Sequence, residues 1–240
     1  MSKLLVSTGF RTDTARKTEI INLENEGLTC QDLGNYPLYT YGAVGSNIGS
    51  FAVICGGLEY DGLVHLGSSL NQCHKLVAGE WQQFTNMTSR RELAAGMAIG
   101  NSLMIFGGYD NGGSGFLKST EIINENGQVS QGPNMPLSIM THTIATVNAS
   151  TLIISGGHTS ASSQNFWSPL TWYFNHVTQK FQGGPSLMER RSFHASATVV
   201  DHNTNENIVV VAGGMQGDTL LDSTELLVNG EWTQGKSHNK

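Results

Sequence analysis

The stretch LMIFGG at residues 103–108 is a short apolar run closed by two glycines, and it decides the fold because it recurs along the chain. The related runs are LLVSTG at 4–9, FAVICGG at 51–57, LIISGG at 152–157 and VVVAGG at 209–214. The closing pairs begin at positions 8, 56, 107, 156 and 213, so the intervals between them are 48, 51, 49 and 57 residues. A period of about 50 residues indicates a protein built from stacked structural repeats.

Two landmarks after each glycine pair keep the same phase. A short apolar segment comes first, and it stands at 18–21, 73–77, 120–123, 171–174 and 224–227. It begins with Thr-Glu in the first, third and fifth copies. An aromatic residue in a polar setting follows as Trp81, Phe181 and Trp232, while Val129 replaces it in the third repeat and the first repeat has none. We interpret these segments as the third and outer strands of a four-stranded unit.

A run of small residues precedes the glycine pair in three repeats, at 91–98, 142–147 and 194–200. Small side chains suit an inner strand that is crowded near an axis. The longest interval contains Asp201–Asn207, a polar insert that we expect to lengthen one hairpin on the surface.

The composition agrees with an all-β chain that is rich in turns. Charged residues make up 13% of the 240 residues, which is low for a soluble domain, and the 29 glycines exceed the usual share. We therefore predict an all-β fold of about five four-stranded antiparallel sheets in one domain spanning 1–240. The repeats are expected at 1–38, 39–88, 89–138, 139–188 and 189–240.

The glycine pair after an apolar strand, the downstream glutamate, the spaced tryptophans and the Arg-Ser-Phe-His sequence at 191–194 together resemble the kelch repeat. The resemblance covers essentially the whole chain. It implies a kelch-type β-propeller, in which twisted four-stranded blades stack face to face around an axis. It also implies a protein-binding module, because many kelch proteins are substrate receptors for ubiquitin ligases or scaffolds of the actin cytoskeleton.

The first repeat opens directly at its glycine-pair strand, Lys3 to Thr8, and leaves no room for an inner strand before it. Kelch rings usually take such a strand from the far terminus, but here only the short polar segment 235–240 follows the last outer strand. The chain is then either a five-bladed ring that is closed imperfectly or part of a six- or seven-bladed propeller. In an open ring the unpaired edge is a site for strand addition by a peptide or by a second copy of the chain.

The repeat glycines are expected at sharp turns, or where another strand approaches too closely for a side chain. They are Gly9, Gly56, Gly57, Gly107, Gly108, Gly156, Gly157, Gly213 and Gly214. An alanine at such a position should disrupt its blade.

Two pairs of arginines end the linkers that enter the inner strands of the third and fifth repeats. In kelch proteins that resemble this one, that linker lies on the face around the central channel, where Arg and Ser often receive acidic peptides. The resemblance therefore implies that a partner binds at Arg90, Arg91, Arg190 and Arg191, whose planar guanidinium groups suit carboxylates. The alternative is that one arginine of each pair only bonds a neighbouring blade.

No set of residues identifies a catalytic or metal site, so we expect neither enzyme activity nor a cofactor. His142 and His194 occupy equivalent repeat positions, which favours a structural role over metal binding. Glu19, Glu121 and Glu225 also recur, and we interpret them as hydrogen-bonding acids within their blades. The alternative function is a carbohydrate-active propeller enzyme of the sugar oxidase or sialate mutarotase type, with its site at the channel mouth.

The net charge and the lack of long apolar segments bear on which classes of partner to expect. The net charge of -6 gives no attraction to a phosphate backbone, so nucleic acid is not expected. The chain has neither an apolar stretch long enough to span a bilayer nor a signal peptide, so we expect no membrane partner and a cytoplasmic location. Cys30, Cys55 and Cys73 share no CxxC spacing, which predicts buried free thiols instead of a disulfide or a zinc site.

Overall fold

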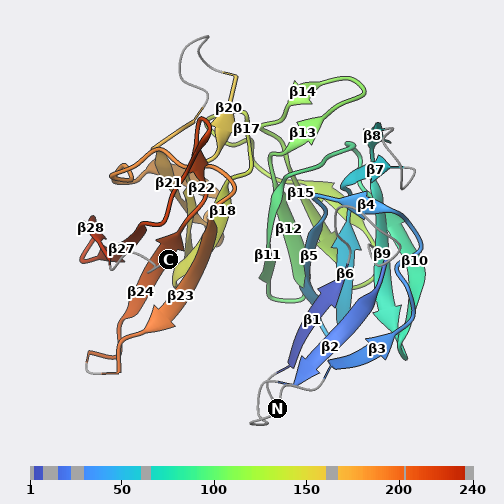
Figure 1. The fold of residues 1–240 in the computed structure, drawn as a ribbon. Coiled ribbons are helices and arrows are strands. Elements are labelled where there is room, and N and C mark those ends of the chain that lie inside the picture. Colours follow the sequence, from blue (N-terminus) through green and yellow to red (C-terminus); the bar gives the residue numbers. More distant parts are fainter. Residues whose placement is uncertain are drawn as a thin grey trace.

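The fold is all-β and antiparallel (Figure 1). The computed structural model describes residues 3–7, 16–22, 30–60, 66–160, 167–202 and 204–235. Every regular element in these ranges is a strand. The repeat glycine Gly9 lies outside them.

Five sheets follow one another along the chain, and we call them the first to the fifth sheet. The first contains β1 (Lys3–Ser7), β2 (Thr18–Asn22) and β3 (Cys30–Leu33). The second contains β5 (Val44–Ile48), β6 (Phe51–Cys55), β9 (Gln72–Val77) and β10 (Glu80–Asn86). The third contains β11 (Ala95–Ile99), β12 (Ser102–Phe106), β15 (Thr120–Asn124) and β16 (Val129–Gln131).

The remaining two sheets have the same strand order. The fourth contains β18 (Thr143–Asn148), β19 (Thr151–Ser155), β21 (Thr171–Asn175) and β22 (Lys180–Gly183). The fifth contains β23 (Ala195–Val200), β24 (Asn207–Ala212), β27 (Thr224–Val228) and β28 (Glu231–Gln234). The predicted landmarks thus fall on the strands expected of them, and the first sheet has three strands where the others have four.

Short strands before and after the glycine pairs form small hairpin sheets, and Figure 1 shows those that it labels at one end of the larger sheets. We call this the hairpin end. Its strands are β4 (Thr40–Tyr41), β7 (Leu58–Tyr60), β8 (Leu66–Ser69), β13 (Tyr109–Asp110), β14 (Gly115–Phe116), β17 (Ile139–Met140), β20 (His158–Thr159), β25 (Met215–Gln216) and β26 (Thr219–Leu220). The predicted polar insert lies at the opposite end, in the hairpin between β23 and β24, and its described residues are mostly exposed.

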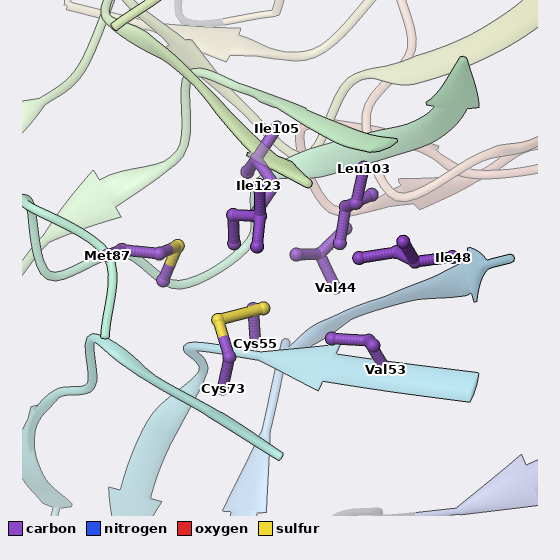
Figure 2. Close-up of a cluster of buried hydrophobic side chains, with 9 residues drawn as sticks. All are labelled: Val44, Ile48, Val53, Cys55, Cys73, Met87, Leu103, Ile105 and Ile123. Atoms are coloured by element: carbon purple, nitrogen blue, oxygen red, sulfur yellow. A yellow bond between two sulfur atoms is a disulfide. The ribbon is translucent and has the colours of Figure 1, made fainter. Parts of the chain in front are cut away.

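The apolar cores lie between consecutive sheets. One buried cluster joins Val53 of the second sheet to Leu103 and Ile105 of the third (Figure 2). A second cluster lies between the third and fourth sheets, and a third lies between the fourth and fifth. Because each sheet buries its faces against its neighbours, stability is shared along the series of sheets.

The glycine pairs have the conformation that the sequence predicted. In the second to fifth sheets both glycines have a positive φ, between 57° and 102°. The second glycine also donates its backbone N–H to the next linker along the chain. Gly57 donates to the carbonyl of Arg91 over 2.9 Å, Gly108 to that of Ile139 over 2.8 Å and Gly157 to that of Arg191 over 2.8 Å.

The prediction of buried free thiols is wrong. Cys55 and Cys73 form a disulfide, and Cys30 is free but exposed. Cys55 and Cys73 are cross-strand partners on β6 and β9, at the positions that Phe106 and Thr120 hold in the third sheet. Their Cα atoms are 4.1 Å apart. Spacing along the chain gave no sign of this pairing because the strand register creates it.

Gly107 tests the close approach of two sheets. A Cβ added to Gly107 would lie 2.5 Å from the backbone oxygen of Ile139, whereas one added to Gly100 would meet no atom within 4 Å. Both glycines have a φ near 57°. We expect Gly107→Ala to lower the free energy of unfolding by about 3 kcal/mol or more, and Gly100→Ala by about 1 kcal/mol from backbone strain alone. Urea unfolding measures both, and equal losses would show that the contact with Ile139 has no effect.

Candidate functional site

Arg91 and Arg191 are buried inside the fold. Both side chains have 0% exposure. Arg91 donates to the carbonyl oxygen of Gly107 over 2.7 Å and to Oε1 of Glu121 over 2.6 Å. Arg191 repeats these bonds with Gly213 over 2.8 Å and with Glu225 over 2.8 Å. Each arginine thus fastens the linker that carries it to the sheet that follows.

The two glutamates complete this arrangement, which we call the Arg–Glu clasp. Glu121 accepts hydrogen bonds from the backbone N–H groups of Thr88 and Ser89 in the same linker as Arg91. Burial raises the pKa of Glu121, but the bonds from Thr88 and the charge of Arg91 outweigh it and leave that pKa below its usual value. Glu225 accepts in the same way from Met188 and Glu189. These glutamates therefore join each sheet to the preceding linker, so the bonds of these two reach beyond their own blades.

The prediction that Arg91 and Arg191 bind a partner is wrong, because neither side chain reaches the surface. The alternative, that one arginine of each pair bonds a neighbouring blade, describes these two residues. The fourth sheet holds Ile139 and Trp172 at the same two positions, within one buried apolar cluster. An apolar pair thus takes the place of the clasp in a sheet of the same form, which marks the clasp as structural.

The other arginine of each pair lies near the surface. Arg90 is exposed. Arg190 is partly exposed and its guanidinium lies 3.4 Å from the carbonyl oxygen of Trp167, at the hairpin end. The four arginines predicted to bind a partner thus fall into two groups. Arg91 and Arg191 are buried and structural, whereas a ligand can reach Arg90 and Arg190.

A row of aromatic rings runs along the hairpin end, and the sequence analysis missed it. The row has two parts, and within each part consecutive rings pack against each other, most of them edge to face, at centroid distances of 5.2 to 6.2 Å. The row consists of Tyr39, Tyr60 and Tyr41 beside the second sheet, Tyr109 and Phe116 beside the third, and His158 and Trp167 beside the fourth. Tyr60 is buried and the other rings are partly exposed.

The two parts of the row are joined by Ser69 of β8. Its hydroxyl accepts from the backbone N–H of Asn111 over 2.9 Å and donates to the carbonyl of Tyr109 over 3.4 Å. A partial signal for the row was present in the sequence, because the residue after the glycine pair is one of its rings in two repeats, Tyr109 and His158. Its meaning depended on the neighbouring hairpins, which come from distant parts of the chain.

Glu92 is the most unusual acid of the hairpin end. Its exposure is 6%, and its Oε2 atom has no hydrogen-bond partner among the described residues. The pKa of Glu92 is raised to about 7, chiefly by burial; a hydrogen bond with Ser69 lowers this pKa and the nearby charge of Asp110 raises it. A carboxyl group with such a pKa is able to hold or release a proton near neutral pH.

The histidines and the remaining charges offer less chemistry. His142 and His194 are buried, and burial lowers the pKa of each to about 3, so both rings are neutral at neutral pH. Across the described residues, no group of three or more His, Cys, Asp or Glu side chains is placed to hold a metal ion. The described part of the chain also holds no helix that is long and apolar enough to cross a membrane.

Two clefts lie away from the hairpin end, beside the fourth sheet. One of about 470 Å³ lies between the fourth and fifth sheets and includes Val147, Glu206 and Leu227 in its lining. The other has a volume of about 710 Å³ and includes Lys180 and Phe181. Tyr173 lines both clefts. Neither cleft is lined by Arg90, Arg91, Arg190 or Arg191, the residues predicted to bind a partner.

The clasp predicts a specific pattern of double-mutant energies. Glu121→Leu leaves the Arg91 guanidinium buried beside an apolar group, so we expect it to lower the free energy of unfolding by about 3–5 kcal/mol. Arg91→Ile with Glu121→Trp copies the fourth sheet and should recover most of this loss, less about 1–3 kcal/mol for imperfect packing. Chemical denaturation of the parent, Arg91→Ile, Glu121→Trp and the double variant gives the coupling energy of the pair, and Glu121→Leu measured beside them gives the cost of an unpaired arginine. A double variant no more stable than Glu121→Leu would contradict the structural role.

Glu92 predicts a pH-dependent stability change. Its folded pKa, about 7, lies above the value of 4.5 for a free carboxyl group, so the stability that the neutral form contributes is lost as the pH rises from 4.5 through 7. Glu92→Gln removes this loss. We expect Glu92→Gln to be more stable than the parent at pH 8 by up to about 3 kcal/mol, and to lose that advantage at pH 5. Urea unfolding at both pH values measures it, with the exposed Glu59→Gln as control; a pH-independent difference would contradict the prediction.

Comparison with known proteins supports the fold and no more. Neither a family model nor a curated protein matches the chain. Among solved structures the chain is similar to YjhT, a protein of the propeller type, with a TM-score of 0.79 and 10% sequence identity. The similarity covers 98% of this chain and 81% of that one. At this identity it shows an all-β, propeller-like arrangement of the sheets.

Proposed function

We propose that the chain is a kelch-type β-propeller scaffold that binds a partner protein or peptide at its hairpin end. The repeat of glycine pair, Thr-Glu strand and linker supports the kelch assignment, and the face-to-face cores support the stacking of sheets as blades. The observation that carries the binding function is the row of aromatic rings across three consecutive sheets, with Arg190 beside it. Tyrosine, tryptophan and arginine are the residues most enriched where proteins bind one another.

The proposed partner is acidic near its contact residues. Arg190 and Arg16 both stand beside rings of the row, and the Arg16 guanidinium lies 5.1 Å from the centroid of Tyr39. A carboxylate that meets these arginines gains charge-assisted hydrogen bonds, while its neighbours bury apolar surface on the rings. Arg90 belongs to this proposal as a further exposed cation, in the linker that enters the third sheet.

The number of blades is also part of the proposal. The five sheets supply five blades, of which the first lacks its inner strand. About a fifth of the YjhT chain stays unmatched, which is roughly the share of one further repeat, so the similarity is compatible with either form of ring.

We retain the cytoplasmic location as a prediction, while the Cys55–Cys73 disulfide is typical of oxidising compartments.

One observation favours a second candidate, a carbohydrate-active enzyme. Glu92 combines burial, a pKa near neutrality and a free carboxylate oxygen beside Asp110 and the aromatic rings. Such a pair of acids is able to divide acid and base roles between its members. Glu92→Gln distinguishes the candidates, because it abolishes turnover in the enzyme and leaves partner binding by a scaffold largely intact.

The binding proposal predicts that two exposed apolar residues at opposite ends of the molecule differ in effect. Leu220 at the hairpin end is 79% exposed, and Val177 in the turn between β21 and β22 is 71% exposed. We expect Leu220→Asp and Arg190→Ala to weaken partner binding at least ~tenfold, and Val177→Asp to leave it unchanged. Quantitative affinity purification followed by titration of the purified partner measures this. Equal loss with Val177→Asp, or no specific partner for the folded parent, would overturn the proposal.

A further inference from the structure

The linkers between sheets form the same two bonds at each junction that contains an arginine. The carbonyl of Arg91 accepts from Gly57 of the second sheet, while its guanidinium binds Glu121 of the third. The carbonyl of Arg191 accepts from Gly157 of the fourth sheet, while its guanidinium binds Glu225 of the fifth. One residue thus bridges two sheets. Four residues after each arginine, the inner strand begins at Ala95 or Ala195.

The junction between the fifth and first sheets has both halves of this bridge without the linker. Gly214 is equivalent to Gly57 and Gly157, yet its backbone N–H has no acceptor among the described residues. Glu19 is equivalent to Glu121 and Glu225 by its register on β2, yet its side chain forms no hydrogen bond or ion pair within the described part of the chain. Glu121 and Glu225 have exposures of 0% and 2%, whereas Glu19 is partly exposed.

The sheet faces at this junction are also uncovered. Val210 of β24 is partly exposed, although the equivalent residues Val53 and Ile153 have an exposure of 0%. On the inner strand Ala145 is 3% exposed, whereas its equivalent on β23, Ala197, is exposed. No strand of the fifth sheet packs extensively against a strand of the first within the described ranges, and Figure 1 shows the two sheets apart.

Among the described residues, the first sheet also ends in an unpaired edge, at β1. Its strand order is β1-β2-β3, so β1 takes the place that the second strand holds in the other sheets. In the third sheet the inner strand β11 pairs with β12 from Ala95 opposite Phe106 to Ile99 opposite Ser102. By the same register, an added strand would pair antiparallel with Ser7 to Lys3. An exposed edge of this kind is a template for strand addition.

We propose that this junction is a docking site for an extended segment of another protein that carries an arginine followed, four residues later, by a β-strand of small and apolar residues. The arginine carbonyl accepts from Gly214, its guanidinium binds Glu19, and the strand adds to β1. This surface differs from the hairpin end, and the inference rests on the proposed function only for the arrangement of the sheets in a ring.

The chemistry of the occupant follows from the junctions that are already filled. Thr18 and Glu19 repeat the Thr-Glu sequence that meets arginine twice, whereas the sheets that lack this glutamate have Thr40 or Ile139 in the linker instead. A second folded copy of the chain is a poor occupant, because its Arg91 and Arg191 are both buried in its own clasps. We therefore assign the site to a free, extended segment of a different chain.

A peptide with the sequence of residues 87–99 tests the proposal, because it contains a complete linker and inner strand. We expect saturable binding of the fluorescein-labelled peptide to the full chain by fluorescence anisotropy. The Arg91→Ala peptide should bind at least ~tenfold more weakly, while the matched Arg90→Ala peptide should change by less than about twofold. Both changes remove one positive charge, so only the position differs.

The protein variants identify the site. Glu19→Gln should weaken binding of the parent peptide and remove its preference over the Arg91→Ala peptide, and Glu59→Gln, at an exposed acid elsewhere, should do neither. Thermal unfolding by circular dichroism checks that each variant is folded. Absence of saturable binding, equal effects of the two arginine changes, or no effect of Glu19→Gln would each overturn the inference. If the peptide does not bind at the junction but partner binding still depends on Leu220, only this inference is overturned. If the peptide binds at the junction but no partner binding depends on Leu220, only the proposed function is overturned.

Discussion

The linker that crosses from one sheet to the next is the constraint on which the rest of the structure depends. Its carbonyl accepts from the second glycine of one sheet, and in two of the junctions its arginine binds the glutamate of the next. The first glycine of the pair also leaves no room for a side chain at this crossing, since a Cβ on Gly107 would meet the linker oxygen of Ile139. The recurrence of the glycine pair in the sequence is thus the trace of a contact between sheets, in addition to a turn within one.

Most of the fold was predictable because every strand signal is local and repeated. Apolar runs, Thr-Glu segments and spaced aromatic residues each mark one strand, and the repeat corrected what a single copy left ambiguous. The cysteines show the limit of this reasoning. Cys55 and Cys73 are 18 residues apart in the chain but become opposite neighbours once β6 and β9 pair. A contact that only the register creates leaves no periodic signal in the sequence.

The candidate site was predicted less well, for a related reason. The sequence presents Arg90 and Arg91 as equals, yet one is exposed and the other is buried. Arg91 is the buried one because it pairs with Glu121, which lies 30 residues away in the chain. A carboxylate buried away from water is strongly destabilising unless a cation is paired with it. The glutamate of each Thr-Glu sequence was predicted to form hydrogen bonds within its own blade. Had it been paired with the linker arginine, both side chains would have been predicted to lie buried between the sheets. The aromatic row was missed because its rings come from hairpins of different sheets.

Repetition also separates structure from function within this chain. A position that is filled in equivalent ways at several junctions, such as the clasp or its Ile139–Trp172 substitute, is accounted for by packing. Interest therefore falls on two other residues. Glu92 breaks the pattern, because its equivalents are Tyr41, Met140 and Ser192. Glu19 keeps the pattern, but its side chain has no described partner. Each of these two carboxyl groups lacks hydrogen-bond partners. A ligand that supplies the missing hydrogen bonds to a buried or half-buried carboxyl group stabilises the folded protein. In this fold, the unmet bonds of a regular repeat are the best guide to where a ligand belongs.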